Sequence, residues 1–72
     1  MKYLIKSRIG ALPGRTMFEL LLEANKRTGY RMYQSDFSAA IHGKDNTPRA
    51  EKILEAADQI LTEWEHPKKK EA

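Results

Sequence analysis

The sequence predicts an all-α protein, a small bundle of three to five helices. The chain has 72 residues, which is enough for one domain at most. Hydrophobic residues make up 40% of it and charged residues 32%, values close to those of ordinary folded domains. The apolar residues recur at helical spacing, between short breaks that contain glycine or proline. Together these observations favour one compact helical module that acts through its surface.

The first nine residues fit either a short helix or an extended strand. Their apolar residues can share one face of a helix, whereas the alternation over residues 3–6 also suits a strand. We favour the helix, because nothing else in the chain offers a strand partner. A break follows over residues 10–14, which contain two glycines and a proline.

A scaffold helix is predicted over about residues 15–28, ending at Gly29, whose freedom to adopt a left-handed backbone suits a helix C-cap. Its predicted apolar side is wide and comprises Met17, Phe18, Leu21, Leu22 and Asn25, together with Leu20 and Ala24.

Two further helices follow. The first is predicted over about residues 34–42, with Phe37, Ala40 and Ile41 on one face and Gly43 after its end. The second is predicted over about residues 48–65, because Thr47 and Pro48 form an N-cap and N1 pair. Its apolar line comprises Ile53, Ala57, Ile60 and Trp64, with Leu54 and Leu61 beside it.

These helices are expected to form a single domain over residues 1–66, followed by a flexible basic tail over 67–72. Pro67 ends the last helix, and the residues beyond it are expected to fray. Lys68, Lys69 and Lys70 either contact phosphates without sequence preference or simply keep the chain soluble.

The charge of the chain is unevenly distributed. The net charge is +3, but residues 1–49 carry +5, residues 50–66 carry −4 and residues 67–72 carry +2. The basic part therefore comes first, which suggests an anionic partner for that half.

Several classes of protein lack support in the sequence. There is no cysteine, and His42 and His66 cannot form a structural zinc site alone. No phosphate-binding loop or hydrolase motif is present, so we expect no enzyme, no cofactor, no metal and no small-molecule substrate. No segment is long and apolar enough for a membrane span. The start of the chain is too short and too charged for a signal peptide, so an intracellular, cytoplasmic protein is expected.

The helix over residues 34–42 has an unusual second face. Its side chains are small or carry an amide or imidazole, whereas a purely solvated face favours lysine and glutamate. Such a face can approach another surface closely, and glutamine and serine can pair with base edges. We therefore expect base contacts from Gln34, Ser35, Ser38, Ala39 and His42.

Basic and polar residues flank this helix on both sides. They could meet the phosphates on either side of a DNA groove, and the start of the next helix offers free backbone N–H groups. The expected phosphate contacts are Arg31, Tyr33, Lys44, Asn46, Thr47 and Arg49.

The segment Phe37-Ser38-Ala39-Ala40-Ile41-His42-Gly43 resembles the recognition helix of lambda-repressor-like regulators, the Cro/repressor or XRE-type helix-turn-helix family. Gln34-Ser35 matches the polar pair that precedes it, and Lys44-Asp45-Asn46-Thr47-Pro48-Arg49-Ala50 resembles the following loop and helix start. The resemblance covers roughly residues 15–62. It implies a helix-turn-helix whose second helix, residues 34–42, enters the major groove of DNA.

Three features depart from the family pattern. Ala39 stands where a long basic residue is frequent, and His42 stands where asparagine is common. The connection over residues 29–33 is about two residues longer than the usual turn.

The resemblance implies a sequence-specific transcriptional regulator, repressor-like and prokaryotic or phage-encoded, that acts at the nucleoid on double-stranded DNA. An alternative is a protein-interaction module of the same fold, an inhibitor or antirepressor that uses its acidic last helix. Regulators of this kind commonly bind DNA as dimers. Ile60, Leu61 and Trp64 therefore either form the seam of a homodimer or complete the core of the single chain.

Overall fold

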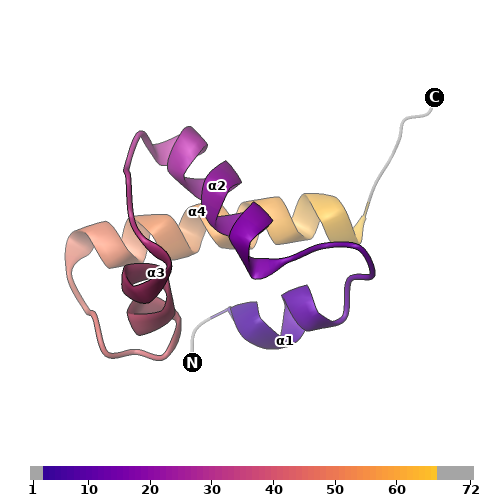
Figure 1. Cartoon of the computed structure of the whole chain (residues 1–72), viewed down its shortest axis with the longest axis horizontal. Helices are drawn as coiled ribbons and strands as arrows, with labels where there is room; N and C mark the ends of the chain where they lie inside the picture. The colour runs from indigo at the N-terminus through magenta and orange to yellow at the C-terminus, as the bar shows by residue number, and fades with distance from the viewer. Residues whose placement is uncertain (1–2, 67–72) are drawn as a thin grey trace.

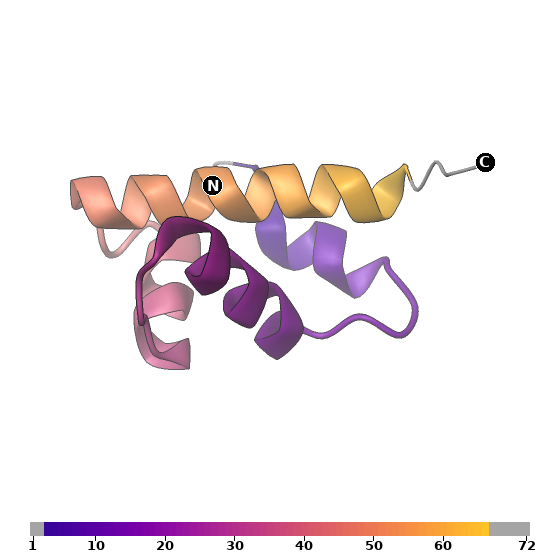
Figure 2. The same cartoon turned by 90° about the horizontal axis from the view of Figure 1, so that it is seen from above.

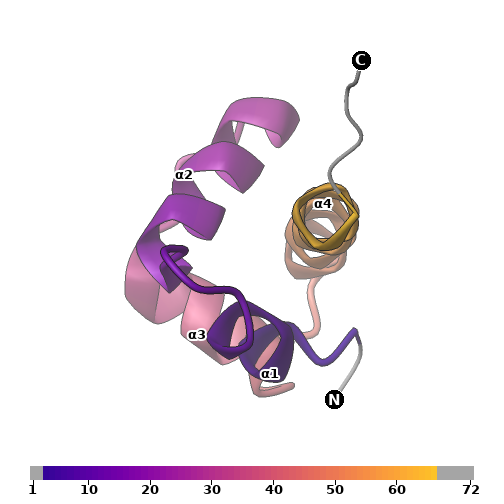
Figure 3. The same cartoon turned by 90° about the vertical axis from the view of Figure 1, so that its right-hand side faces the viewer.

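The computed structural model describes residues 3–66. Over these residues the chain forms four α-helices and no strand: α1 (Ile5–Gly10), α2 (Met17–Thr28), α3 (Gln34–Ile41) and α4 (Pro48–Glu65). The long helix α4 forms one layer, and the other three helices lie on one side of it (Figure 1, Figure 2, Figure 3). The predicted all-α bundle is confirmed, and so is the preference for a helix near the N-terminus.

The core is centred on α4, which places more buried side chains in it than any other described helix. Phe37 is the largest side chain that is fully buried, and the other helices add apolar residues around it. The residues that α4 contributes are Ala50, Ile53, Leu54, Ala56, Ala57, Ile60 and Leu61.

Local capping signals set the ends of the helices. The Thr16 hydroxyl accepts a hydrogen bond from the Glu19 N–H (3.1 Å), and the Glu19 carboxylate accepts one from the Thr16 N–H (3.2 Å). This reciprocal pair starts α2 at Met17, two residues later than predicted, because Thr16 itself has an extended backbone. Gly29, with φ of 80°, ends the helix as expected.

The buried side of α2 is narrower than the predicted one. Leu20, Leu21 and Ala24 are buried against the rest of the bundle, whereas Phe18 and Leu22 are half exposed. Apolar residues occupy more than half of the turn in this helix, so the sequence alone left its orientation open. The packing against α4 selects the arc around Leu20 and Ala24 and leaves Phe18 and Leu22 at its edge.

Two arginines from the basic part of the chain bind carboxylates of α4. The Arg8 guanidinium donates to Glu65 Oε2 (2.9 Å) and to Asp58 Oδ1 (2.6 Å), which ties α1 to α4. Arg27 donates to both carboxylate oxygens of Glu63, at 2.7 and 2.8 Å. Three of the five carboxylates of residues 50–66 are therefore paired with arginines from the basic part of the same chain.

These ion pairs predict that the chain loses stability in acid. Hydrogen bonds from Arg27 and Arg8 hold the pKa values of Glu63 and Glu65 below their ordinary value of 4.5. A carboxyl whose pKa is lower in the folded state stabilises that state fully above its unfolded pKa, and the gain disappears as pH falls through the folded pKa. We expect the melting temperature to be constant near neutral pH and to fall below about pH 4.5.

The variant Arg27→Met tests the contribution of Glu63. Without the hydrogen bond from Arg27, the pKa of Glu63 is no longer lowered by it, so the melting temperature should fall less steeply in acid. An unchanged pH profile in that variant would contradict the assignment.

The basic tail predicted over residues 67–72 lies outside the described residues. Among residues 3–66, no helix has the length and apolar character needed to cross a membrane.

Candidate nucleic-acid interface

The two faces of α3 have the properties that the sequence predicts. Phe37, Ala40 and Ile41 are buried against the bundle. Gln34, Ser35, Ser38 and His42 are exposed, and Ala39 is half-buried at the boundary between the two faces. Figure 2 shows α3 running away from α4. All five predicted base-contact residues are thus on or beside one accessible strip.

The connection between α2 and α3 is held in place by Asn25. Its amide nitrogen donates to the Met32 carbonyl (3.1 Å), and its amide oxygen accepts from the Met32 N–H (3.1 Å). Met32 itself is buried, so this long turn has its own anchor in the core. The sequence predicts Asn25 only as part of an apolar stripe, and this role was not predicted. An amide within an otherwise apolar stripe was the available signal.

At the N-terminal end of α3, Tyr33 and Arg31 are both exposed. Tyr33 occupies the N-cap position with an extended backbone, and its side chain makes no capping hydrogen bond. Its relative exposure is 76%, the highest among the large hydrophobic and aromatic residues of the described chain. Both side chains are therefore accessible to a ligand that approaches this end of the helix.

At the C-terminal end, the backbone makes a tight left-handed turn. The Gly43 N–H donates to the Ala40 carbonyl (3.2 Å) and the Lys44 N–H to the Ala39 carbonyl (2.8 Å), with φ of 77° at Gly43. This pair of bonds is the Schellman arrangement. It turns the chain outward, so that Lys44, Asn46 and Arg49 are all exposed.

Thr47 is engaged within the chain. Its N–H and its hydroxyl both donate to Asp45 Oδ1, at 3.1 and 2.9 Å, and its hydroxyl accepts from the Ala50 N–H (3.2 Å). The hydroxyl proton is therefore used, and a carboxylate stands next to it. The Thr47 side chain is therefore poorly suited to a phosphate contact, although it is exposed.

The remaining cations around α3 differ from those that tie the helices together. Arg8 and Arg27 each hold carboxylates, and their pKa values are raised by the hydrogen bonds to Glu65 and Glu63. Arg31, Lys44 and Arg49 form no ion pair with any carboxylate of residues 3–66. Positive charge on both sides of α3 is therefore available to an anionic partner.

The candidate dimer seam falls mostly inside the chain. Ile60 and Leu61 are fully buried, so they complete the core of this chain, which was the alternative to a seam. Trp64 is half-buried, and the Arg15 guanidinium lies 4.2 Å from the centre of its ring. Only Trp64 of the three is accessible at the surface.

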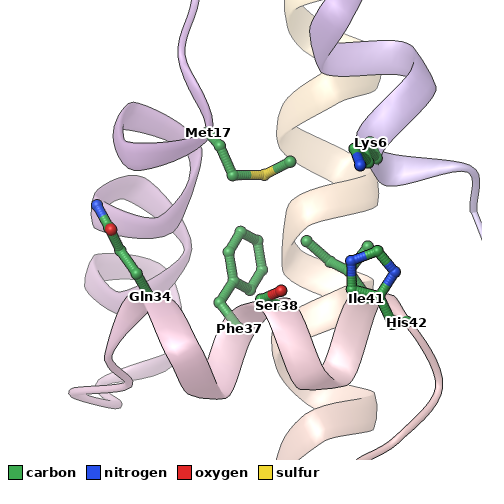
Figure 4. A pocket seen from close by; sticks show the side chains of 7 residues that line it. All are labelled: Lys6, Met17, Gln34, Phe37, Ser38, Ile41 and His42. Atoms are coloured by element: carbon green, nitrogen blue, oxygen red, sulfur yellow. The ribbon is translucent and has the colours of Figure 1, made fainter.

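An open pocket of about 370 Å³ lies along one side of α3, between it and the N-terminal helices (Figure 4). Three predicted base-contact residues line it, together with Met17 from the start of α2 and Lys6 from α1, for which the sequence predicts no contact. The lining residues are Lys6, Met17, Gln34, Phe37, Ser38, Ile41 and His42. Nothing in the local sequence marks Lys6, because its position opposite α3 depends on how α1 packs.

Within residues 3–66, no three His, Cys, Asp or Glu side chains come close enough to hold a metal ion. Comparison of the chain with protein-family models, with curated proteins and with solved structures finds no match. The candidate site therefore depends on the geometry described above and on the resemblance found in the sequence.

Proposed function

We propose that the chain binds double-stranded DNA and places the exposed face of α3 in the major groove. The observation that carries this proposal is the combination of that face with its flanks. The face bears only small, amide or imidazole side chains, and both ends of the helix carry cations that pair with no carboxylate of residues 3–66. The major groove is wide enough to admit one α-helix.

The proposed contacts divide into two groups. Gln34 can make two hydrogen bonds to an adenine, and Ser35, Ser38 and His42 can reach other base edges. Arg31, Lys44 and Arg49 would bind phosphates, fix the position of the helix and supply most of the affinity. Tyr33 and Asn46 offer further hydrogen bonds to the backbone.

We further propose that the protein is a transcriptional regulator that acts by occupying its DNA site, in a prokaryotic or phage setting. This rests on the resemblance to lambda-repressor-like regulators. A single α3 reads few bases, so two copies on adjacent half-sites, about 34–36 Å apart, would give higher selectivity.

One observation favours the second candidate function, a module that binds another protein. Phe18 and Leu22 lie one helical turn apart on α2, and both are half exposed. The acidic helix α4 is less suited to this role than the sequence suggested, because Arg8 and Arg27 occupy three of its carboxylates. Salt separates the two functions, since binding to DNA falls steeply with ionic strength and apolar binding to a protein does not.

The test is a selection of bound sequences from a pool of random duplex DNA, followed by affinity measurements on the selected site. We expect Gln34→Ala to reduce discrimination at one base pair by about 1–3 kcal/mol. Arg49→Ala should weaken binding to all sequences alike. It should also reduce the slope of log affinity against log salt concentration by about 1. Gln59→Ala, an exposed amide on α4, is the matched control and should change nothing.

A palindromic consensus would indicate two copies on one site. Absence of both sequence enrichment and salt-dependent binding would refute the DNA-binding proposal. If Gln34→Ala discriminated between base pairs as well as Gln59→Ala does, the base contact proposed for α3 would be refuted.

A further inference from the structure

The pocket beside α3 has a lining that suits an anion with an apolar neighbour. Lys6 of α1 and His42 at the end of α3 stand on its rim, and Figure 4 shows Lys6 on the side of Ile41 and His42. Half-buried Met17 supplies apolar surface, whereas Phe37 and Ile41 line the pocket but are almost fully buried. None of the described residues that line the pocket is acidic.

Two other hollows on the described part of the chain differ in charge. The one between α2 and Trp64 is lined by three cations, Arg15, Lys26 and Arg27, but Glu19 and Glu23 pair with the two arginines. The one beside the start of α4 has Asp45 and Glu51. Carboxylates in those places oppose the binding of a phosphate, whereas the described residues that line the pocket beside α3 include Lys6 and no carboxylate.

Lys6 is also free to act on a ligand. It is exposed and forms no ion pair with a carboxylate of residues 3–66, unlike Arg8 two residues later on the same short helix. Arg8 instead fixes α1 against α4, and Ile5 and Ile9 of α1 are buried in the core. The structure therefore holds the backbone that carries Lys6 in a defined position opposite α3.

We propose that α1 also belongs to the DNA interface and that Lys6 binds a backbone phosphate at this pocket. The inference rests on the proposed function. The phosphate lies between the Lys6 ammonium and the Ser38 and His42 side of α3, and the carbons of the adjoining deoxyribose contact the apolar surface at Met17. Phosphates are thus bound on a side of α3 that the sequence analysis left without a cation.

The test measures binding to a random-sequence duplex over a range of salt concentrations, with Lys6→Gln and a matched control. Each phosphate bound by a cation contributes about 0.9 to the slope of log affinity against log salt. Lys6→Gln should reduce the slope by about that amount. Lys26→Gln is the control, because Lys26 is an exposed lysine of α2 that lines the hollow beside Trp64, away from α3. It should leave the slope unchanged, and circular dichroism should show both variants folded.

A second measurement locates the contact. Neutral methylphosphonates are placed one at a time in a duplex that the protein binds, and one of them should weaken the wild-type chain but not Lys6→Gln. Salt-dependent binding by the wild-type chain with equal slopes for Lys6→Gln and Lys26→Gln would overturn this inference and leave the proposed function intact. Absence of salt-dependent DNA binding in the wild-type chain would overturn the proposed function itself.

Discussion

Replacing Phe37 by alanine should bring the chain to the edge of unfolding. Phe37 is the largest fully buried side chain, and it holds α3 against the rest of the bundle. Truncating a buried phenylalanine to alanine costs about 3–5 kcal/mol, since it removes buried surface and leaves a cavity. A domain of this size has a total stability of about 3–10 kcal/mol. Urea unfolding followed by circular dichroism should show the loss directly.

Phe18→Ala is the matched control for this experiment. Phe18 belongs to the same residue type and lies on the neighbouring helix α2, but it is half exposed. Its truncation should cost less than about 1 kcal/mol, because surface substitutions outside special sites have small effects. Phe37→Leu should fall between the two, and it keeps the measurement possible if Phe37→Ala does not fold. Equal losses for Phe18→Ala and Phe37→Ala would show that α2 packs through the wider stripe that the sequence suggested.

The contrast between these two phenylalanines shows where prediction from the sequence ends. The helix ends at Gly29, Gly43 and Thr47 follow from local chemistry, namely left-handed glycines and a threonine N-cap, so they could be predicted. The orientation of α2 depends on contacts with α4, more than twenty residues away in the chain. Because α2 has apolar residues around most of its surface, periodicity could not choose between Phe18 and Leu20 for the core.

The candidate site shows the same division. The exposed face of α3 was predictable, because one short helix carries both the buried residues and the polar ones. The place of Lys6 was not, since α1 has only six residues and a helix that short is not stable in isolation. The charge pattern was also only half informative. The basic first part of the chain includes Arg8 and Arg27, and both form ion pairs with carboxylates of α4.

Replacing Arg8 by methionine should cost about 2–3 kcal/mol of stability and should detach α1. Methionine keeps the aliphatic stem but loses the bonds to Glu65, to Asp58, to Thr62 and to the Tyr3 carbonyl. An exposed ion pair contributes about 0–1 kcal/mol, whereas removing one partner of a buried pair costs about 3–5 kcal/mol. The Arg8 side chain is only 20% exposed and it holds two carboxylates, so its loss should lie between these limits.

Arg27→Met is the control for the importance of burial. Arg27 also binds two carboxylates, Glu23 and Glu63, but its own side chain is 32% exposed and that of Glu63 is 57% exposed. Its loss should therefore cost less than about 1 kcal/mol, and most of that cost should vanish in high salt. The cost of Arg8→Met should persist in salt, because partial burial shields the cluster from mobile ions. Protection of the α1 amides in hydrogen exchange should fall only in Arg8→Met. Equal and salt-sensitive losses in the two variants would mean that α1 is held by Ile5 and Ile9 alone.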